Sequence, residues 1–444
     1  MGLGLHGGGL VSAQFFAEHG AEVTVTDLRD AHTLLPSMDK LKTLGIKYVL
    51  GRHEASDFAS ADLVIKNPAV SPGSPYLEIA REVETDISIF LKIYRGKVIA
   101  ITGTKGKSTS ASAIHHVLKK RYRGAVLGGN ITISPLSYLL GGNRLDGPAV
   151  LELSSWQLAD LRGGEPLKAN VALVTNIMRD HQNRYKSMQD YISDKEVICE
   201  NQTSEDVLVL NYDDPVTRSF AEKSAASVRY FSRQRMPRGF FGSSLEDTGG
   251  SYHGPEGTYS LLPSTPMVRG DHNRMNLLAA GTCCLLFGVP AVDVKEGIES
   301  FPGIEHRLEY VQTINGVDFY NDSAATIPEA TVEAVNSFQK PVVLVAGGTD
   351  KALEFNVLKT LKSKTKLIAL LEGTGTDLIM LTLRSAKIPF IGPFPSLQKL
   401  IACIMELTES GDIILFSPGC TSFGMFRNEF DRGAIFKKIV QELA

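Results

Sequence analysis

The stretch Ile101-Thr-Gly-Thr-Lys-Gly-Lys-Ser-Thr109 decides how the rest of the chain is interpreted. The apolar run Val98-Ile99-Ala100 precedes it, and a small-residue run with helical character, Ser110 to Ile114, follows it. A strand that ends in a glycine-rich turn and continues into a helix presents backbone N–H groups and the positive end of the helix dipole to an anion. The sequence therefore predicts a phosphate-binding loop in an α/β domain.

The residue types in this loop suit a nucleoside triphosphate. Gly103 and Gly106 allow the backbone to approach phosphate closely, and Lys107 would reach the β- and γ-phosphates. A hydroxyl from Ser108 or Thr109 would bind Mg²⁺. The motif is a shortened variant, because the full pattern has a further glycine at its start. An ordinary glycine-rich turn therefore stays open as the structural alternative.

Composition narrows the class of protein. The 444 residues suggest about three domains. A formal net charge of −3 gives no basic surface for nucleic acid. The five cysteines show no CxxC spacing, which favours a reducing compartment, and we find no signal peptide and no apolar run long enough to span a membrane. We expect a cytoplasmic enzyme.

A second glycine cluster lies at the start of the sequence. Gly2, Gly4 and Gly7 fit the pattern GxGxxG, and an expected helix at 10–19 and strand at 22–27 follow them. The strand ends in an acidic residue, as in dinucleotide-binding folds, so an NAD-dependent oxidoreductase is an alternative from another class. The strand that should precede the glycines is almost absent, however, and the same turn can hold other diphosphates, including that of a sugar nucleotide.

The remaining apolar runs indicate an α/β chain throughout. Each expected strand ends in Gly, Pro or Asn, as strands buried on both faces of a parallel sheet do, and functional loops should lie at their carboxyl ends. We expect such strands at 62–68, 171–176, 341–348 and 412–419, and helices at 189–201, 276–287 and 328–337. Domain boundaries are expected near Tyr94-Arg95 and near Pro302-Gly303.

Polar motifs follow these strands in a fixed order. They are Val150-Leu-Glu152-Leu-Ser-Ser-Trp-Gln-Leu158, Thr175-Asn-Ile-Met-Arg-Asp-His181, Lys195, Gly270-Asp-His-Asn-Arg-Met-Asn276, His306-Arg-Leu-Glu309, Asn321-Asp-Ser-Ala-Ala-Thr326, Gly347-Gly-Thr-Asp-Lys351 and Ser417-Pro-Gly-Cys-Thr-Ser422. Together they resemble the Mur ligases, the ATP-dependent amide-forming enzymes of peptidoglycan precursor synthesis. The resemblance covers essentially the whole chain.

Within that family the chain is most similar to the D-glutamate-adding members. The strand end at 152–158 and the compact N-terminal region with Asp27-Leu-Arg29 carry this likeness. It implies three α/β domains: a Rossmann-like UDP-substrate domain at 1–94, a central P-loop ATPase-type domain at 95–302, and a Rossmann-like amino-acid domain at 303–444. The expected reaction joins D-glutamate to UDP-N-acetylmuramoyl-L-alanine through an acyl phosphate, with the chain acting as a monomer on small molecules.

The resemblance also implies roles for single residues. Those expected at ATP are Gly103, Thr104, Lys105, Gly106, Lys107, Ser108, Thr109, Asn273, Arg307 and Asp322. Those expected at the UDP substrate are Leu5, His6, Asp27, Arg29 and Asn130, which replaces the NAD interpretation. Those expected at the amino acid are Thr326, Lys351, Ser422 and Phe423. The expected catalytic residues are Lys107, Glu152, His181 and Lys195.

The same resemblance implies two Mg²⁺ sites. The expected ligands are Ser108, Thr109, Glu152, His181 and Lys195. The carboxylate and the triphosphate that react are both anions. Positive charge from metal ions and cationic side chains must therefore be present at the site. From its neighbours Asp194 and Glu196 alone, Lys195 reads as an exposed helical lysine. The resemblance instead implies a carbamylated, anionic side chain.

The chain departs from the family pattern at several positions. The third-domain motif has Ala324 where a lysine is usual, the late motif continues as Phe423-Gly424, and Lys105 replaces an asparagine. The lost lysine should weaken amino-acid binding. A different amino-acid acceptor, a folylpolyglutamate-synthase-like activity and a non-catalytic nucleotide-binding module remain alternatives.

Overall fold

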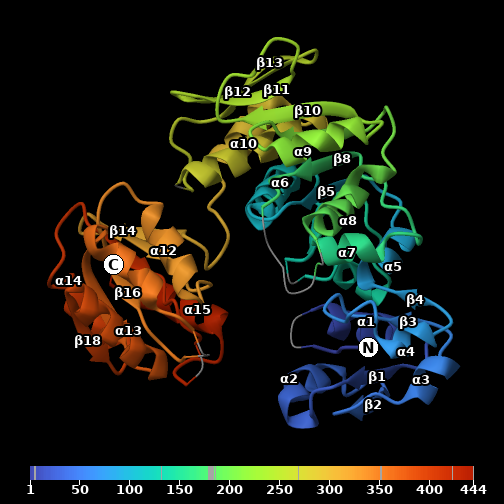
Figure 1. Cartoon of the computed structure of the whole chain (residues 1–444), viewed down its shortest axis with the longest axis horizontal. Helices are drawn as coiled ribbons and strands as arrows, with labels where there is room; N and C mark the ends of the chain where they lie inside the picture. Colours follow the sequence, from blue (N-terminus) through green and yellow to red (C-terminus); the bar gives the residue numbers. More distant parts are fainter. Residues whose placement is uncertain are drawn as a thin grey trace. The chain divides into compact units, whose positions relative to one another are not determined.

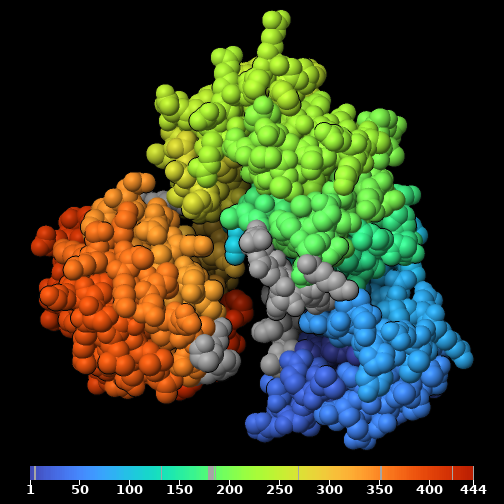
Figure 2. All heavy atoms as spheres, in the orientation of Figure 1, coloured from blue at the N-terminus to red at the C-terminus, as the bar shows by residue number. Residues whose placement is uncertain are grey.

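In the computed structural model of the chain, the described residues are 1–4, 7–131, 133–178, 185, 187–268, 270–350, 353–422 and 424–443. They divide into two compact units. The first unit comprises Met1–Thr265 with Met275–Glu299, and the second comprises Pro266–Arg274 with Ser300–Ala444. Figure 1 and Figure 2 show the first unit in blue to yellow-green and most of the second in orange to red.

The first unit contains three β-sheets. Two are two-stranded and parallel, β1-β2 and β3-β4, and the third has nine strands in the order β13-β12-β11-β10-β9-β8-β5-β7-β6. In the third sheet, all neighbouring strands in the run β11-β10-β9-β8-β5-β7-β6 pair in parallel. Strand β12 pairs antiparallel with both β11 and β13. The strands are β1 (Thr24–Asp27), β2 (Lys47–Leu50), β3 (Val64–Ile65), β4 (Val83–Glu84), β5 (Val98–Thr102), β6 (Val126–Gly129), β7 (Ala149–Glu152), β8 (Val171–Val174), β9 (Val207–Asn211), β10 (Ser227–Ser232), β11 (Gly242–Glu246), β12 (Gly249–Gly254) and β13 (Gly257–Leu262).

Helices connect these strands. They are α1 (Gly8–Glu18), α2 (Ala31–Leu41), α3 (Ala55–Ser60), α4 (Pro75–Glu78), α5 (Asp86–Ile93), α6 (Lys107–Arg121), the 3₁₀ helix η1 (Pro135–Gly142), α7 (Ser155–Asp160), α8 (Met188–Glu200), α9 (Pro215–Ser219), the 3₁₀ helix η2 (Phe220–Glu222), α10 (Asp271–Leu286), which crosses from the second unit into the first, and α11 (Ala291–Glu299).

Period-two alternation along the central strands builds the core of the first unit. Val98 and Ala100 of β5 pack in one buried cluster with Val197 and Ile198 of α8. Ile99, between them, is also fully buried but points to the opposite face of the sheet. A strand buried on both faces is continuously apolar, which explains the uninterrupted run before the phosphate loop.

The second unit is a six-stranded sheet with helices. The strand order is β14-β15-β19-β16-β17-β18, parallel except for the antiparallel edge strand β14. Its strands are β14 (Glu309–Ile314), β15 (Val317–Asn321), β16 (Val342–Ala346), β17 (Thr365–Leu371), β18 (Phe390–Phe394) and β19 (Ile413–Phe416). Its helices are α12 (Pro328–Asn336), the 3₁₀ helix η3 (Asn356–Ser363), α13 (Thr374–Ala386), α14 (Leu397–Met405) and α15 (Glu429–Glu442).

The elements expected from the sequence are present with shifted ends. The expected strand at 62–68 is only the short β3, and the expected helix at 276–287 begins earlier, at Asp271. The mixed α/β class is confirmed. The division near residue 300 lies close to the expected boundary at Pro302-Gly303, whereas residues 1–94 and the central sheet form part of the same compact unit.

Candidate functional site

The predicted phosphate loop lies at the carboxyl end of β5, which lies between the parallel strands β8 and β7 of the nine-stranded sheet. Helix α6 begins directly after it, at Lys107. The end of the neighbouring strand β8 supports the loop: Asn176 Oδ1 accepts from the Lys105 N–H at 2.9 Å, and the Thr175 hydroxyl donates to the Lys105 carbonyl at 2.6 Å. The loop conformation is thus held by its neighbour strand.

Both loop glycines are required by their backbone geometry. Gly103 has φ 139° and Gly106 has φ 84°, in the region that L side chains rarely adopt. A Cβ at Gly103 would collide with the Thr175 hydroxyl, and a Cβ at Gly106 with the Asn276 side chain. Any other residue would therefore disturb the loop at both positions.

Two lysines lie against this loop. Lys107 Nζ donates to the carbonyls of Gly103 and Thr104, both at 2.9 Å. Lys195, from α8, is only 2% exposed, and its Nζ donates to the Gly103 carbonyl at 3.0 Å. Lys195 is therefore a buried residue beside the phosphate loop, unlike the exposed helical lysine that its charged neighbours alone suggest.

Tyr191 is a site residue that the sequence analysis did not name. It lies one helical turn before Lys195 on α8, and its ring lies 4.7 Å from Lys195 Nζ. Its hydroxyl is 3.0 Å from the Thr104 hydroxyl of the phosphate loop. The i, i+4 spacing on one helix face was the available signal, once Lys195 had been placed.

Glu152 ends β7, the strand beside β5, and is 1% exposed. Asn130, after β6, holds it twice: the Asn130 side chain donates to Glu152 Oε1 at 2.9 Å, and the Asn130 N–H donates to the Glu152 carbonyl at 2.8 Å. Glu152 Oε2 is buried and has no hydrogen-bond partner among the described residues. One carboxylate oxygen is thus fixed and the other is left for a ligand.

A cavity of about 350 Å³ lies beside the phosphate loop. Gly103, Lys107, Asn130 and Lys195 line it together with Asp86, which the sequence analysis also missed. Burial raises the pKa of the Asp86 carboxyl, and backbone hydrogen bonds offset this only in part. In the sequence Asp86 reads merely as the first residue of a capped helix, so no local signal separates it from an ordinary first-turn aspartate.

Asp27, the acidic residue after the N-terminal glycines, has internal partners. Its carboxylate accepts from the Arg29 side chain at 2.9 and 3.1 Å and from the Gly4 N–H at 3.2 Å. Burial alone would raise the pKa of Asp27, but the hydrogen bonds from Arg29 and Gly4 outweigh it and lower the pKa. Leu5 and His6, expected beside Asp27 and Arg29, lie outside the described residues.

In the second unit, Asp322 follows β15 and is buried. Its carboxylate accepts from the Ser417 hydroxyl at 2.7 Å and from the Leu308 N–H at 3.1 Å. Burial raises the pKa of Asp322 to about 7, against smaller opposing effects of Ser417, Leu308 and the charge of Arg307. The carboxyl thus joins the loops after β15 and β19 and the loop before β14.

Arg432 of α15, absent from the expected set, ties two of these loops together. Arg432 is 1% exposed, and its guanidinium donates to the Ser323 carbonyl at 2.8 Å and to the Cys420 carbonyl at 3.0 Å. Burial lowers the pKa of Arg432 to about 10. A cation thus lies in the interior of the unit near Ala324, whose own position lacks one.

The other expected residues of the second unit differ in exposure. Ser422 is buried, and its hydroxyl has no partner among the described residues. Thr326 and Asn273 are half-buried, and Arg307 is exposed. Lys351 and Phe423 lie outside the described residues.

Comparison with known proteins gives a consistent result along the chain. Residues 1–89 match the family described as the Mur ligase MurD-like N-terminal domain, and residues 101–284 match the Mur ligase middle domain. Proteins named UDP-N-acetylmuramoylalanine–D-glutamate ligase from Roseiflexus sp. (strain RS-1) and Borreliella afzelii are each 39% identical to the chain. The first alignment covers 99% of this chain and 97% of the relative, and the second 100% and 97%. The chain belongs to the Mur ligase family.

Solved structures agree with a Mur ligase fold. A UDP-N-acetylmuramate-alanine ligase from Thermotoga maritima is similar with TM-score 0.62 and 20% identity, covering 98% of this chain and 97% of that one. MurF from Acinetobacter baumannii is similar with TM-score 0.59 and 16% identity, covering 96% and 92%. The match over residues 1–89 also removes the reason for interpreting the N-terminal glycines as an NAD site.

The metal ligands expected for this Mur ligase are placed in part. Ser108 and Thr109 lie in the first turn of α6, and Glu152 lies at the end of β7. His181, the imidazole of the expected set, lies outside the described residues. No group of three or more His, Cys, Asp or Glu residues able to hold a metal occurs within the described ranges. The free buried oxygen of Glu152 still fits an oxygen-seeking cation such as Mg²⁺.

The raised pKa of Asp322 predicts a pH dependence of stability in the second unit of this Mur ligase. In the unfolded chain the carboxyl loses its proton near pH 4, whereas in the folded unit it keeps the proton until about pH 7. The folded state therefore binds more protons in this window, and the free energy of unfolding should fall as the pH rises through it, then level off. For one proton the slope is up to about 1.4 kcal/mol per pH unit.

The change that tests this is Asp322→Asn, whose amide keeps hydrogen-bonding capacity toward Ser417 and Leu308 without titrating. Hydrogen exchange of buried amides in β15 and β19, corrected for the intrinsic rate at each pH, reports the opening of the second unit. Between pH 4 and pH 7, the free energy of opening should decrease less in the variant than in the parent chain. Equal slopes in both proteins would contradict a proton held by Asp322.

Proposed function

We propose that the chain is an ATP-dependent ligase that joins D-glutamate to UDP-N-acetylmuramoyl-L-alanine and releases ADP and phosphate, a step of peptidoglycan precursor synthesis. The observation that carries the proposal is the alignment of nearly the full chain with relatives named for this reaction, at 36% to 39% identity. The relative from Treponema pallidum is among them, with 99% of this chain and 96% of the relative aligned.

The first step requires a carboxylate to attack the γ-phosphoryl group of ATP. Both reactants are anions, so the site must supply positive charge where negative charge accumulates. The N–H groups at the start of α6 and the ammonium of Lys107 face the phosphate loop and serve this purpose. The oxygen of the carboxylate forms a bond to phosphorus as ADP leaves, which gives an acyl phosphate.

The second step is attack of the amine of D-glutamate on the acyl carbon. The amine must lose a proton, the intermediate carries negative charge on oxygen, and phosphate then leaves with the C–O bonding pair. Lys107 remains close enough to the phosphate loop to stabilise charge on the departing phosphate. Asp86 lines the same cavity with a raised pKa, so it is a candidate acceptor for the proton of the amine.

Mg²⁺ would supply charge neutralisation and orientation for the triphosphate. Among the described residues, the groups that would hold Mg²⁺ are the hydroxyl of Ser108 or Thr109 and the free oxygen of Glu152. Asn130 fixes the other oxygen of Glu152, so the orientation of this carboxylate is set before any ligand binds. We assign His181 to the same metal centre on the resemblance alone.

Lys195 is proposed to carry a carbamate. Its neutral amine would form a C–N bond to CO₂ and lose one proton, which replaces a cation by an anion beside the phosphate loop. The support is its position: it is buried next to Gly103, where a metal-binding anion would be useful and an ordinary surface lysine would not occur. A second Mg²⁺ would then share this carbamate.

The two flanking sites are assigned from the family resemblance. Asp27, Arg29, Leu5 and His6 are proposed for the uridine diphosphate. In the second unit, Thr326, Lys351, Ser422 and Phe423 are proposed for D-glutamate, and Asn273, Arg307 and Asp322 for the adenosine part of ATP. The buried free hydroxyl of Ser422 is the feature of the described structure that best fits a polar ligand there.

We further propose that the chain acts as a monomer in the cytoplasm on small-molecule substrates. None of the helices in the described part of the chain combines the length and the apolar character that a membrane span needs.

The substrate assignment is tested by phosphate release from ATP with UDP-N-acetylmuramoyl-L-alanine and a panel of D- and L-amino acids. D-glutamate should give the largest kcat/KM of the panel. Its KM should be higher than that of a relative with lysine at this position, because Ala324 removes a cation from the expected amino-acid site. Omitting the UDP substrate should abolish release. A clear preference for another amino acid would overturn the acceptor while leaving the ligase chemistry in place.

A further inference from the structure

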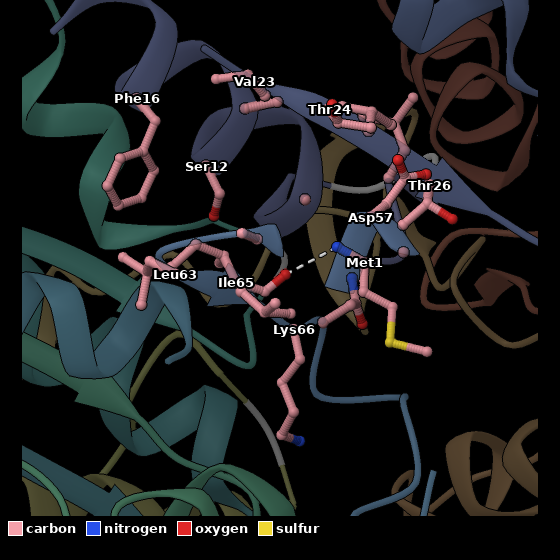
Figure 3. A pocket seen from close by; sticks show the side chains of 18 of the residues that line it. Met1, Ser12, Phe16, Val23, Thr24, Thr26, Asp57, Leu63, Ile65 and Lys66 are labelled. Carbon is pink, nitrogen blue, oxygen red and sulfur yellow. Dashed lines mark hydrogen bonds between the residues drawn. The ribbon is translucent and has the colours of Figure 1, made fainter. Parts of the chain in front are cut away.

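A buried ion pair joins the segment after β3 to helix α7. Lys66 Nζ lies 2.6 Å from Asp160 Oδ2, and the two side chains are only 6% and 7% exposed. Lys66 directly follows β3, and Asp160 is the last residue of α7. Figure 3 shows the Lys66 side chain extending away from the other labelled residues. The pair therefore connects a small N-terminal sheet with a helix of the nine-stranded sheet, inside one compact unit.

Local stability does not explain this pair. Asp160 lies in the last turn of α7, where the negative end of the helix dipole disfavours a carboxylate. Both charges also lose hydration on burial, so an apolar pair of similar volume often stabilises a protein as well or better. An ion pair with defined geometry can instead hold the two segments that carry it in one arrangement.

Both segments continue into the walls of the cavity beside the phosphate loop. Residues 67–69, directly after Lys66, line this cavity, and so do residues 154–157 at the start of α7. Neither Lys66 nor Asp160 is among the described residues that line it. The pair thus acts on the cavity only through the segments that it joins.

Lys66 also holds the turn that follows it. The Ala69 N–H donates to Asn67 Oδ1 at 3.0 Å, and the Val70 N–H donates to the Asn67 carbonyl at 2.9 Å. Lys66 Nζ donates to the Val70 carbonyl at 3.5 Å while it pairs with Asp160. One ammonium group therefore links the end of this turn to the end of α7.

We propose that Lys66 and Asp160 are positioning residues for the UDP-linked carboxylate substrate, because their ion pair fixes the 67–70 turn against α7. This inference rests on the proposed function. The phosphate loop and Asn130, which is assigned to the UDP substrate, both line the cavity, so the substrate carboxylate would meet the γ-phosphoryl group there. The end of β8, and not this pair, holds the phosphate loop. Breaking the pair should therefore affect the UDP substrate and leave ATP binding unchanged.

The test replaces the ion pair by an apolar pair in the full chain, Lys66→Met with Asp160→Leu. This double variant leaves no unpaired buried charge, so its Tm should stay within roughly 4 °C of the parent. Its KM for UDP-N-acetylmuramoyl-L-alanine should rise roughly tenfold or more, because a displaced wall misplaces the substrate. The KM for ATP should change less than about twofold. In the ligand-free chain, hydrogen exchange at the Ala69 and Val70 amides should become roughly tenfold faster.

Three further variants serve as controls. Lys66→Arg keeps a cation beside Asp160 and should retain most of the affinity for the UDP substrate. Arg81→Met with Asp62→Leu removes an ion pair whose side chains are 65% and 99% exposed, and it should change neither KM nor the exchange of the turn. Asp160→Asn keeps the shape of the side chain without its charge. It replaces the apolar double variant if that variant does not fold, and it should raise the same KM by a smaller factor.

The other outcomes count against the positioning role. A folded double variant with the parental KM for the UDP substrate would make the pair merely structural, whether or not the turn exchanges faster. An equal rise in both KM values would indicate a general disturbance of the site. A parent chain that releases no phosphate with the UDP substrate would overturn the proposed function itself, and this result is distinct from any difference between the variants.

Discussion

Lys107→Ala is expected to lower kcat/KM for ATP-dependent ligation by roughly a hundredfold to a thousandfold. The Lys107 ammonium is the cation at the first residue of α6, and it lies over the phosphate loop at 2.9 Å from two loop carbonyls. Truncation removes this charge from the place where negative charge accumulates on the transferred phosphoryl group. The loop itself should keep its shape, because Thr175 and Asn176 hold it from β8.

The measurement is phosphate release under single-turnover conditions, with thermal unfolding as the check on the fold. Lys119→Ala is the matched control: Lys119 lies on the same helix, is exposed, and lies in the last turn, far along the helix from the loop. It should retain parental activity. A folded Lys107→Ala variant with the rate of this control would exclude a role of the lysine in phosphoryl transfer.

The phosphate loop was predictable from sequence because its information is local. A strand, two glycines, a lysine and a helix start follow one another within nine residues, so chain order is also spatial order. Its flanking elements, β5 and α6, follow from apolar periodicity for the same reason. The positive φ of Gly103 and Gly106 gives the physical cause of the two glycines.

The surroundings of the loop could not be derived in this way. The burial of Lys195 depends on how α8 packs against β5, and its charged neighbours Asp194 and Glu196 suggest the opposite. Lys195 entered the expected site only through the family resemblance. Asp86 and Tyr191 had no such support, and only the fold brings them to the cavity and the loop.

The N-terminal region shows a prediction that was partly informative. The near absence of a strand before the glycines could be read from the sequence, but its consequence could not. The structure shows two separate small sheets, and residues of β1 and β3 line a cavity of about 700 Å³. Similarly, the missing lysine at Ala324 was evident, whereas the buried cation of Arg432 beside the same loop depends on the packing of α15.

Lys195→Ala is expected to lower the ligation rate by roughly a hundredfold or more. The kind of small ion that restores activity to this variant should identify the charge that the native side chain carries. The structure allows two roles. An ammonium at Lys195 would hold the phosphate loop through the Gly103 carbonyl, 3.0 Å from Nζ. A carbamate would instead hold Mg²⁺ with an oxygen. The two roles place opposite charges in the same buried space.

Small molecules can fill the space left by the truncated side chain. If the native group is a carbamate, formate or acetate should restore part of the rate to Lys195→Ala, and methylammonium should not. The ammonium role predicts the reverse. Lys119→Ala, treated in the same way, controls for general salt effects, and ¹³CO₂ labelling should give a carbamate NMR signal in the parent chain that Lys195→Ala lacks. Rescue by methylammonium without this signal would rule out the carbamate and leave Lys195 as a cation that positions the loop.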